Sequence, residues 1–166
     1  SGAPPAVQEL VRTAIGPELY EQKLQALAGV EALGGPAAPW HKKIVLDDSE
    51  VHPQIRSDAA VMLGKLGEWE FLLAALDSES FDIANAAAPP FMVVLPERPT
   101  NERTSLLARV AGIASRSKSP YARASAMSVL GMTKDRRYTT VCLENLAVPN
   151  ERIDGASARF EVAQRS

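Results

Sequence analysis

Apolar residues recur along most of the chain three or four positions apart. Trp69, Leu72, Leu73 and Leu76 follow the i, i+3, i+4, i+7 pattern of one helix face, and segments 55–66 and 138–146 show a similar spacing. No segment sustains the period-two alternation of a half-buried strand. The best strand candidate is 91–95, which lies between the prolines at 89–90 and the proline at 96. We interpret it as the second half of a proline-broken helix, so the pattern predicts an all-α protein.

Glycine and proline pairs divide the chain into short helices, with proline suited to a first helical turn. The predicted helices are 5–15, 18–33, 37–47, 53–66, 68–77, 80–95 (broken near 89), 101–115, 120–132, 136–147 and 151–164. The links between them are short, so consecutive helices are expected to pack antiparallel.

Parts of the sequence repeat. Segment 55–64 is similar to 122–131 at an offset of 67 residues, and Pro53 maps onto Pro120 at the same offset. Segment 23–29 fits the first of these at an offset of 33, and 76–86 matches 146–156 at an offset of 70. The repeating unit is therefore about 28–39 residues, two helices long. One helix pair cannot bury both its apolar faces alone, so a stack of four to five pairs is expected.

The motif Ile-Arg-Ser-Asp-Ala-Ala-Val-Met-Leu-Gly-Lys-Leu-Gly at 55–67 resembles the first helix of HEAT-like repeats, of the short type found in phycobilisome lyase accessory proteins. Segment 68–77 looks like the second helix. The resemblance covers 17–164 and weakens at 88–115, where Pro89-Pro90 departs from the pattern. It implies a right-handed α-α superhelix that binds partners. We therefore expect one HEAT-like solenoid domain of about four to five antiparallel helix pairs over 5–166, after a flexible segment or tag remnant at 1–4.

Composition narrows the class of protein further. Apolar residues make up 46% and charged residues 23%, as in globular domains, and no apolar run could span a bilayer. The one cysteine, Cys142, excludes an internal disulfide and is expected in the core. The first residues lack signal-peptide features. A cytoplasmic location is favoured, and a periplasmic or lipoprotein location would follow if a signal was removed before Ser1.

The sequence gives little evidence for a catalytic or metal-binding site. The two histidines, His41 and His52, lie near Asp47, Asp48 and Glu50, but their spacing fits no metal motif, and a solvated acidic turn is the simpler interpretation. The sequence holds no Gly-x-Ser-x-Gly motif and no phosphate-binding glycine loop. We therefore expect a non-enzymatic protein with no catalytic residues, no cofactor and no metal.

Charge is distributed unevenly. Residues 46–82 hold nine acids and two bases, whereas 98–137 hold nine bases and two acids. In a linear stack, sequence order is spatial order, so one interpretation is a two-signed surface that orients a partner, and the other is a chance distribution of solvated charges. Arg56 and Arg123 occupy equivalent repeat positions and are expected to be structural. Trp40 and Trp69 fit core packing better than ligand binding.

The predicted function is an interaction scaffold or adaptor that binds a protein or peptide on the concave face formed by the second helices. The candidate partner-binding residues are Trp40, Lys42, Lys43, Glu70, Arg103, Arg109, Arg116, Arg136 and Arg137. One alternative is a nucleic-acid-binding HEAT-like module. The acidic pI of about 5.7 argues against it, and only Tyr121 and Tyr138 accompany the basic segment. The other alternative is an accessory subunit of a lyase-type enzyme. The sequence does not indicate the oligomeric state.

Overall fold

The computed structural model describes residues 4–33, 35–47, 51–133 and 135–146, and all regular structure in this part of the chain is helical. The all-α prediction is therefore confirmed. The helices are α1 (Pro5–Ile15), α2 (Tyr20–Glu31), α3 (Ala38–Leu46), α4 (Pro53–Lys65), α5 (Trp69–Leu76), α6 (Phe81–Ala87), α7 (Pro89–Val93), α8 (Thr100–Arg116), α9 (Pro120–Met132) and α10 (Thr139–Leu146). Three-residue 3-10 turns lie at Gly35–Ala37, Leu95–Glu97 and Arg136–Tyr138. The helix predicted at 151–164 lies outside the described residues.

The repeated segments begin in the same way. Proline is the first residue of both α4 and α9. The side chain before it accepts a backbone N–H of the first turn: His52 Nδ1 from Gln54 (3.2 Å) and Ser119 Oγ from Ala122 (3.2 Å).

The end of α4 is fixed by a glycine with positive φ. Gly67 has φ of 79°, a left-handed conformation that glycine adopts without steric strain because it has no Cβ. Its N–H donates to the Gly64 carbonyl (3.0 Å), and the Glu68 N–H donates to the Leu63 carbonyl (2.9 Å). This pair of hydrogen bonds stops α4 and turns the chain directly into α5.

Prolines divide the segment from 81 to 97, as predicted. Pro89 and Pro90 lack the N–H that would continue α6, so α6 ends at Ala87 and α7 begins at Pro89. Phe91 and Leu95, from the segment that was the best strand candidate, are buried helical or 3-10 residues. The break keeps these side chains in the core while it redirects the chain towards α8.

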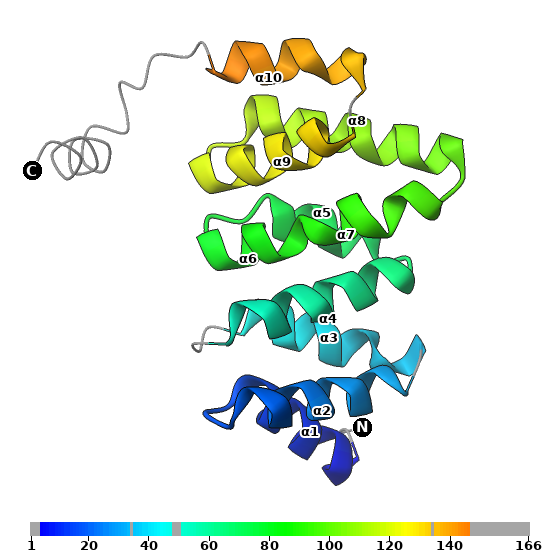
Figure 1. The fold of residues 1–166 in the computed structure, drawn as a ribbon, viewed down its shortest axis with the longest axis vertical. Helices are drawn as coiled ribbons and strands as arrows, with labels where there is room; N and C mark the ends of the chain where they lie inside the picture. The colour runs from blue at the N-terminus through cyan, green and yellow to red at the C-terminus, as the bar shows by residue number, and fades with distance from the viewer. Residues whose placement is uncertain (1–3, 34, 48–50, 134, 147–166) are drawn as a thin grey trace, which may run out of the picture.

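The helices form two rows. In the first row, α2 contacts α4, α4 contacts α6 and α7, and both of these contact α9. In the second row, α1 contacts α3, α5 contacts α8, and α8 contacts α10. Figure 1 shows successive layers of helices along the long axis, with α1 and α2 at one end and α10 at the other.

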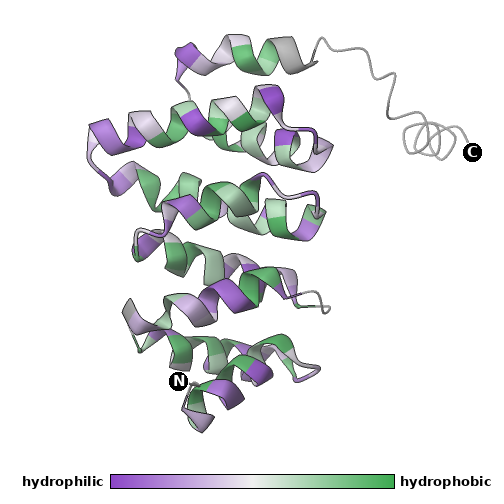
Figure 2. Ribbon diagram, turned by 180° about the vertical axis from the view of Figure 1, so that it is seen from behind, coloured by the Kyte–Doolittle hydropathy of each residue, from purple (hydrophilic) through white to green (hydrophobic). Residues whose placement is uncertain are grey.

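Apolar side chains fill the space between the rows and between the layers. Hydrophobic positions recur in every layer (Figure 2), and fully buried residues such as Ile44, Leu63, Leu72 and Val110 come from both rows. Burial of each such side chain contributes about 1.5–3 kcal/mol relative to exposure. No helix in the described part of the chain has both the length and the apolar character needed to cross a bilayer.

Three arginines connect neighbouring helices through backbone carbonyls. Arg56 is buried and donates to the Val45 carbonyl at the end of α3 (2.5 Å), while Arg123 donates to the Ser117 carbonyl just after α8 (2.9 Å). The predicted structural role of these equivalent residues is thus confirmed. Arg98 makes a similar contact, because its Nη2 donates to two backbone carbonyls at the end of α4.

Candidate binding groove between α5 and α8

The sequence-predicted binding residues all come from the second row or from the turn that precedes α10. Trp40, Lys42 and Lys43 lie on α3, Glu70 on α5, and Arg103, Arg109 and Arg116 on α8, while Arg136 and Arg137 lie in the turn before α10. They do not form one continuous site. The structure distributes eight of the nine among three surface hollows and the α3–α5 junction, and Arg136 lines none of these hollows.

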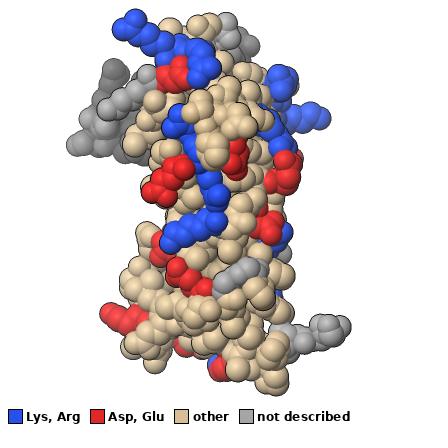
Figure 3. Space-filling view, turned by 90° about the vertical axis from the view of Figure 1, so that its right-hand side faces the viewer, with Lys and Arg blue, Asp and Glu red and all other residues tan. Residues whose placement is uncertain are grey.

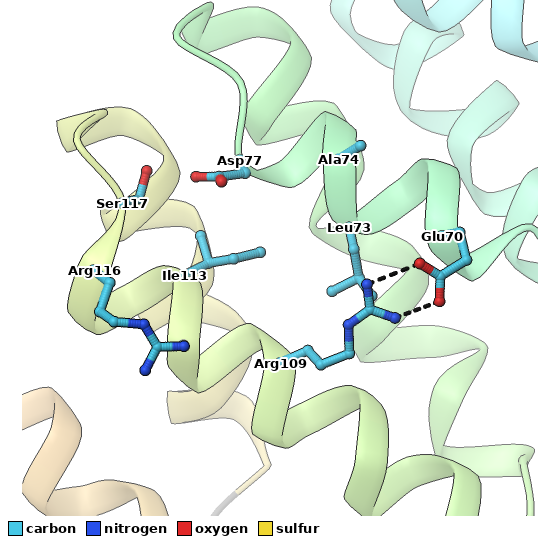
Figure 4. A pocket seen from close by; sticks show the side chains of 9 residues that line it. Glu70, Leu73, Ala74, Asp77, Arg109, Ile113, Arg116 and Ser117 are labelled. Atoms are coloured by element: carbon cyan, nitrogen blue, oxygen red, sulfur yellow. Dashed lines mark hydrogen bonds and ion pairs between the residues drawn. The ribbon is translucent and has the colours of Figure 1, made fainter.

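A hollow of about 470 Å³ lies between α5 and α8. Its apolar lining comes from Leu73 and Ala74 on α5 and from Gly112 and Ile113 on α8. Figure 4 shows polar side chains at both ends, with Glu70 and Arg109 at one end and Asp77, Arg116 and Ser117 at the other. We call this hollow the α5–α8 groove.

At one end of the groove, Glu70 and Arg109 form a two-pronged ion pair. Arg109 Nη2 donates to Glu70 Oε2 (2.8 Å), and Nη1 donates to Oε1. These hydrogen bonds lower the pKa of the Glu70 carboxyl and raise that of the Arg109 guanidinium. Both side chains are solvent-exposed, so the pair contributes little to stability and a competing ligand could replace either partner.

At the other end, Arg116 and Asp77 have no ion-pair partner within the described residues. A Cβ placed on Gly112 would lie 2.6 Å from Arg116 Nη2, so this glycine leaves room for the guanidinium to lie back along α8. Asp77 also lines the groove, and its backbone N–H donates to the Leu73 carbonyl, which terminates α5. The groove thus presents one positive and one negative group that are available to a ligand.

The three predicted residues on α3 make different contacts. Lys42 pairs with Glu68 (2.8 Å), and its Nζ lies 5.4 Å from the centre of the Phe71 ring, so it ties α3 to the start of α5. Trp40 and Lys43 line a shallow hollow of about 440 Å³ shared with α1. Trp40 is half-buried against the core, whereas Trp69 is buried and lies 5.5 Å from Phe91, so core packing is confirmed for Trp69.

The remaining arginines come from the start of α8 and from the turn before α10. Arg103 and Arg137 line a hollow of about 380 Å³ whose apolar wall includes Leu107 and Met132. Arg103 donates to the Pro96 carbonyl (3.2 Å), and Arg137 is held by Asp135 (2.5 Å), which has a lowered pKa for this reason. Arg136 is exposed.

The charge gradient is visible on the surface. Figure 3 shows most basic side chains in the upper half of the molecule, nearer the C-terminal helices and interspersed with acidic ones, and mainly acidic side chains in the lower half. Many of these bases are already bonded to carbonyls or carboxylates. Within the described part of 98–137, those without an ion pair or hydrogen bond through the side chain are Arg116, Lys118 and Arg136.

The two histidines have different environments. No group of three potential metal ligands occurs in the described part of the chain, and Asp48 and Glu50 lie outside it. His52 caps α4, whereas the His41 side chain is fully buried with both ring nitrogens unpartnered, and burial lowers its pKa to about 4. Sequence reasoning missed this burial, although position 41 lies three residues before the buried Ile44.

Sequence reasoning also missed Asp77, Gly112, Ile113 and Ser117 as groove residues. The one signal for them was their place in or directly after a second-row helix.

The comparison with known proteins found no match: no family model, curated protein or solved structure matches this chain.

Proposed function

We propose that this protein is a HEAT-like α-solenoid that acts as a non-enzymatic interaction module and binds a protein or peptide on its second-row face. The similarity between 55–64 and 122–131 supports the repeat architecture. So does the equivalence of Arg56 and Arg123, each of which donates to a carbonyl at the end of the preceding second-row helix. A stack of such units forms an extended binding face from its second helices.

The α5–α8 groove is the observation that carries the binding function. Its apolar centre, Leu73 and Ile113, can bind an aliphatic or aromatic side chain, while Arg116 can donate hydrogen bonds to a carboxylate of the same ligand. A volume of about 470 Å³ suits a few side chains of a peptide segment. The lining holds neither histidine nor cysteine, which favours recognition over covalent chemistry.

The alternative functions have less support. A single-stranded nucleic-acid site would combine basic residues with exposed aromatic rings. Tyr138, within the basic segment, is buried, and Tyr121 lies on the first row beside Phe81. An accessory role in a lyase-type enzyme stays a prediction that no feature of the groove favours.

Site-directed photo-crosslinking tests the proposal. A photoreactive amino acid replaces Ala74, which is exposed in the groove, or Ala124, which is exposed on the first row and serves as the matched control. In lysate from the native source, we expect a discrete adduct from position 74 and none from 124. The adduct should weaken as salt rises, because the free charges of the groove are solvent-accessible. Equal adducts from the two positions would contradict the proposal.

A pair of neighbouring basic residues supplies a second control. Arg116 lines the groove and Lys118 does not, and neither has an ion-pair partner within the described residues. We expect Arg116→Ala to weaken the position-74 adduct several-fold and Lys118→Ala to leave it almost unchanged. Parallel losses in both variants would indicate a diffuse electrostatic attraction. A salt-dependent titration with DNA checks the nucleic-acid alternative directly.

A further inference from the structure

A hollow on another side of the molecule carries an inference independent of the α5–α8 groove. It is the hollow of about 380 Å³ lined by Arg103 and Arg137, and it lies where α7, the start of α8 and the end of α9 come together. We call it the α8–α9 hollow. The link between α7 and α8 lies on the right-hand side of Figure 1, the side that faces the viewer in Figure 3.

The hollow has an apolar wall to which three parts of the chain contribute. Phe91 and Leu95 come from the proline-broken segment, Leu107 comes from α8, and Met132 comes from the end of α9. The first three are buried core residues, whereas Met132 is 65% exposed. Because methionine is flexible and polarizable, a side chain in this position can adapt to an apolar ligand that lies against the fixed part of the wall.

The α8 side of the hollow changes from polar to apolar along the helix. Its lining residues follow the i, i+3, i+4, i+7 spacing of one helix face and are Thr100, Arg103, Thr104 and Leu107. The three polar residues precede Leu107 on this face. A ligand that lies along α8 therefore meets polar groups at one end and an apolar surface at the other.

The charge of the lining is positive, because two arginines accompany a single acid, Asp135. Arg137 is paired with Asp135, so no carboxylate of the lining is left to neutralise Arg103. Arg103 donates to neutral acceptors, the Pro96 carbonyl (3.2 Å) and the Thr100 hydroxyl (3.5 Å). These bonds hold the guanidinium beside the hollow, and they use only two of its five N–H donors.

The volume of the hollow limits the size of a ligand. A water-sized group takes about 30 Å³, so about 380 Å³ holds about a dozen non-hydrogen atoms. Pockets for small molecules have volumes of about 300 Å³ and more, whereas an α-helix with its side chains is about 10–12 Å wide. The hollow thus suits a small molecule better than a folded element of a partner.

We propose that the α8–α9 hollow binds a small amphiphilic anion, an aliphatic carboxylic acid of about eight to ten carbon atoms. Its carboxylate accepts hydrogen bonds from the unused N–H groups of Arg103, and its chain packs against Leu107 and Met132. A neutral ligand of the same length leaves the Arg103 charge uncompensated, and an ammonium group is repelled by it.

Backbone amide NMR titration of the full chain tests this assignment with octanoate, octanol and octylammonium, which share one chain length. We expect saturable octanoate shifts that map to Leu95, Thr104 and Met132, several-fold weaker binding of octanol and at least tenfold weaker binding of octylammonium. Butyrate should also bind at least tenfold more weakly, because it buries fewer methylene groups. Equal affinities for octanoate and octylammonium would overturn the role of charge. Absence of saturable octanoate shifts, or shifts that map elsewhere, would overturn the proposal as a whole.

A peptide C-terminus offers a similar combination of carboxylate and apolar side chain, and N-acetyl-leucine serves as its probe. We expect it to bind at least tenfold more weakly than octanoate, because its amide would lie against an apolar wall. Tighter binding of N-acetyl-leucine than of octanoate would assign the hollow to peptide C-termini and would overturn the assignment to an aliphatic acid.

Neighbouring substitutions on α8 locate the site. Thr104→Phe places a ring in the hollow, whereas Ser105 is exposed and does not line it, so Ser105→Phe is the matched control. We expect at least a tenfold loss of octanoate affinity in the first variant and no change in the second. Equal losses in the two variants would contradict the proposed location.

A last pair of variants separates a binding role of Arg103 from a structural one. Arg103→Met should weaken octanoate binding at least tenfold and abolish the preference for octanoate over octanol, whereas Arg103→Lys should preserve that preference. A preference that survives Arg103→Met would overturn the role of this residue. Arg116→Ala, which tests the groove, should leave octanoate binding unchanged, so the two proposals can fail separately.

Discussion

His41 should make the stability of this protein depend on pH. Its side chain is fully buried on α3, among core residues such as Ile44, and neither ring nitrogen has a hydrogen-bond partner. A charged imidazolium in this position would lose its hydration without compensation. Burial therefore lowers the pKa of His41 from 6.5 to about 4, and the ring is neutral in the folded protein at neutral pH.

The size of the effect follows from the two pKa values. Between pH 6.5 and about pH 4 the unfolded chain binds a proton at His41 that the folded chain does not. The free energy of unfolding therefore falls as the pH is lowered through this window, by up to about 1.4 kcal/mol per pH unit. The total loss reaches about 3 kcal/mol near pH 4, a large part of the stability of a typical domain.

Urea unfolding at a series of pH values measures this loss. Protonation of carboxylates with lowered pKa, such as those of Glu70 and Asp135, also lowers the stability of the folded protein in acid. The difference in free energy of unfolding between wild type and His41→Leu therefore isolates the contribution of the histidine. The difference should be constant above pH 6.5 and shift in favour of the variant below it. Ile44→Val, a core change on the same helix, should lower stability by about 1 kcal/mol at every pH. Parallel profiles for wild type and His41→Leu would refute the reasoning.

Four further changes can be measured by the same unfolding assay at neutral pH. Gly64→Ala should lower the free energy of unfolding by up to about 2 kcal/mol, because its Cβ would lie 3.0 Å from Pro90 Cβ and this crowding outweighs the helix-propensity gain of alanine. Gly131→Ala, at the equivalent repeat position with open space around it, should stabilise α9 by about 0.5–1 kcal/mol, and equal losses at both glycines would be inconsistent with this packing. Gly67→Ala should cost about 1 kcal/mol, since φ is 79° there, and a neutral result would contradict the left-handed end of α4. Arg123→Met removes the hydrogen bond to the Ser117 carbonyl (2.9 Å) and should cost about 1 kcal/mol; unchanged stability would argue against a stabilising link between α9 and the end of α8.

The groove could be predicted from the sequence only in part. Glu70, Arg109 and Arg116 were among the predicted binding residues because they are charged residues of second helices. Their partners were not predictable, since Glu70 and Arg109 lie 39 positions apart and meet only when α5 packs on α8. Arg98 belongs to the basic segment of the sequence, but its guanidinium is not free for a partner, because it donates to carbonyls at the end of α4.

The sequence alone determined where the helices begin and end. These boundaries depend on local geometry: the fixed φ of Pro53, the left-handed Gly67 and the missing N–H groups of Pro89 and Pro90 act on the residues next to them. Tertiary structure alone decided which charges are free for a partner and which aromatic rings are exposed. A charge belongs to its residue, but its availability depends on atoms from other helices, and packing of the layers sets those distances.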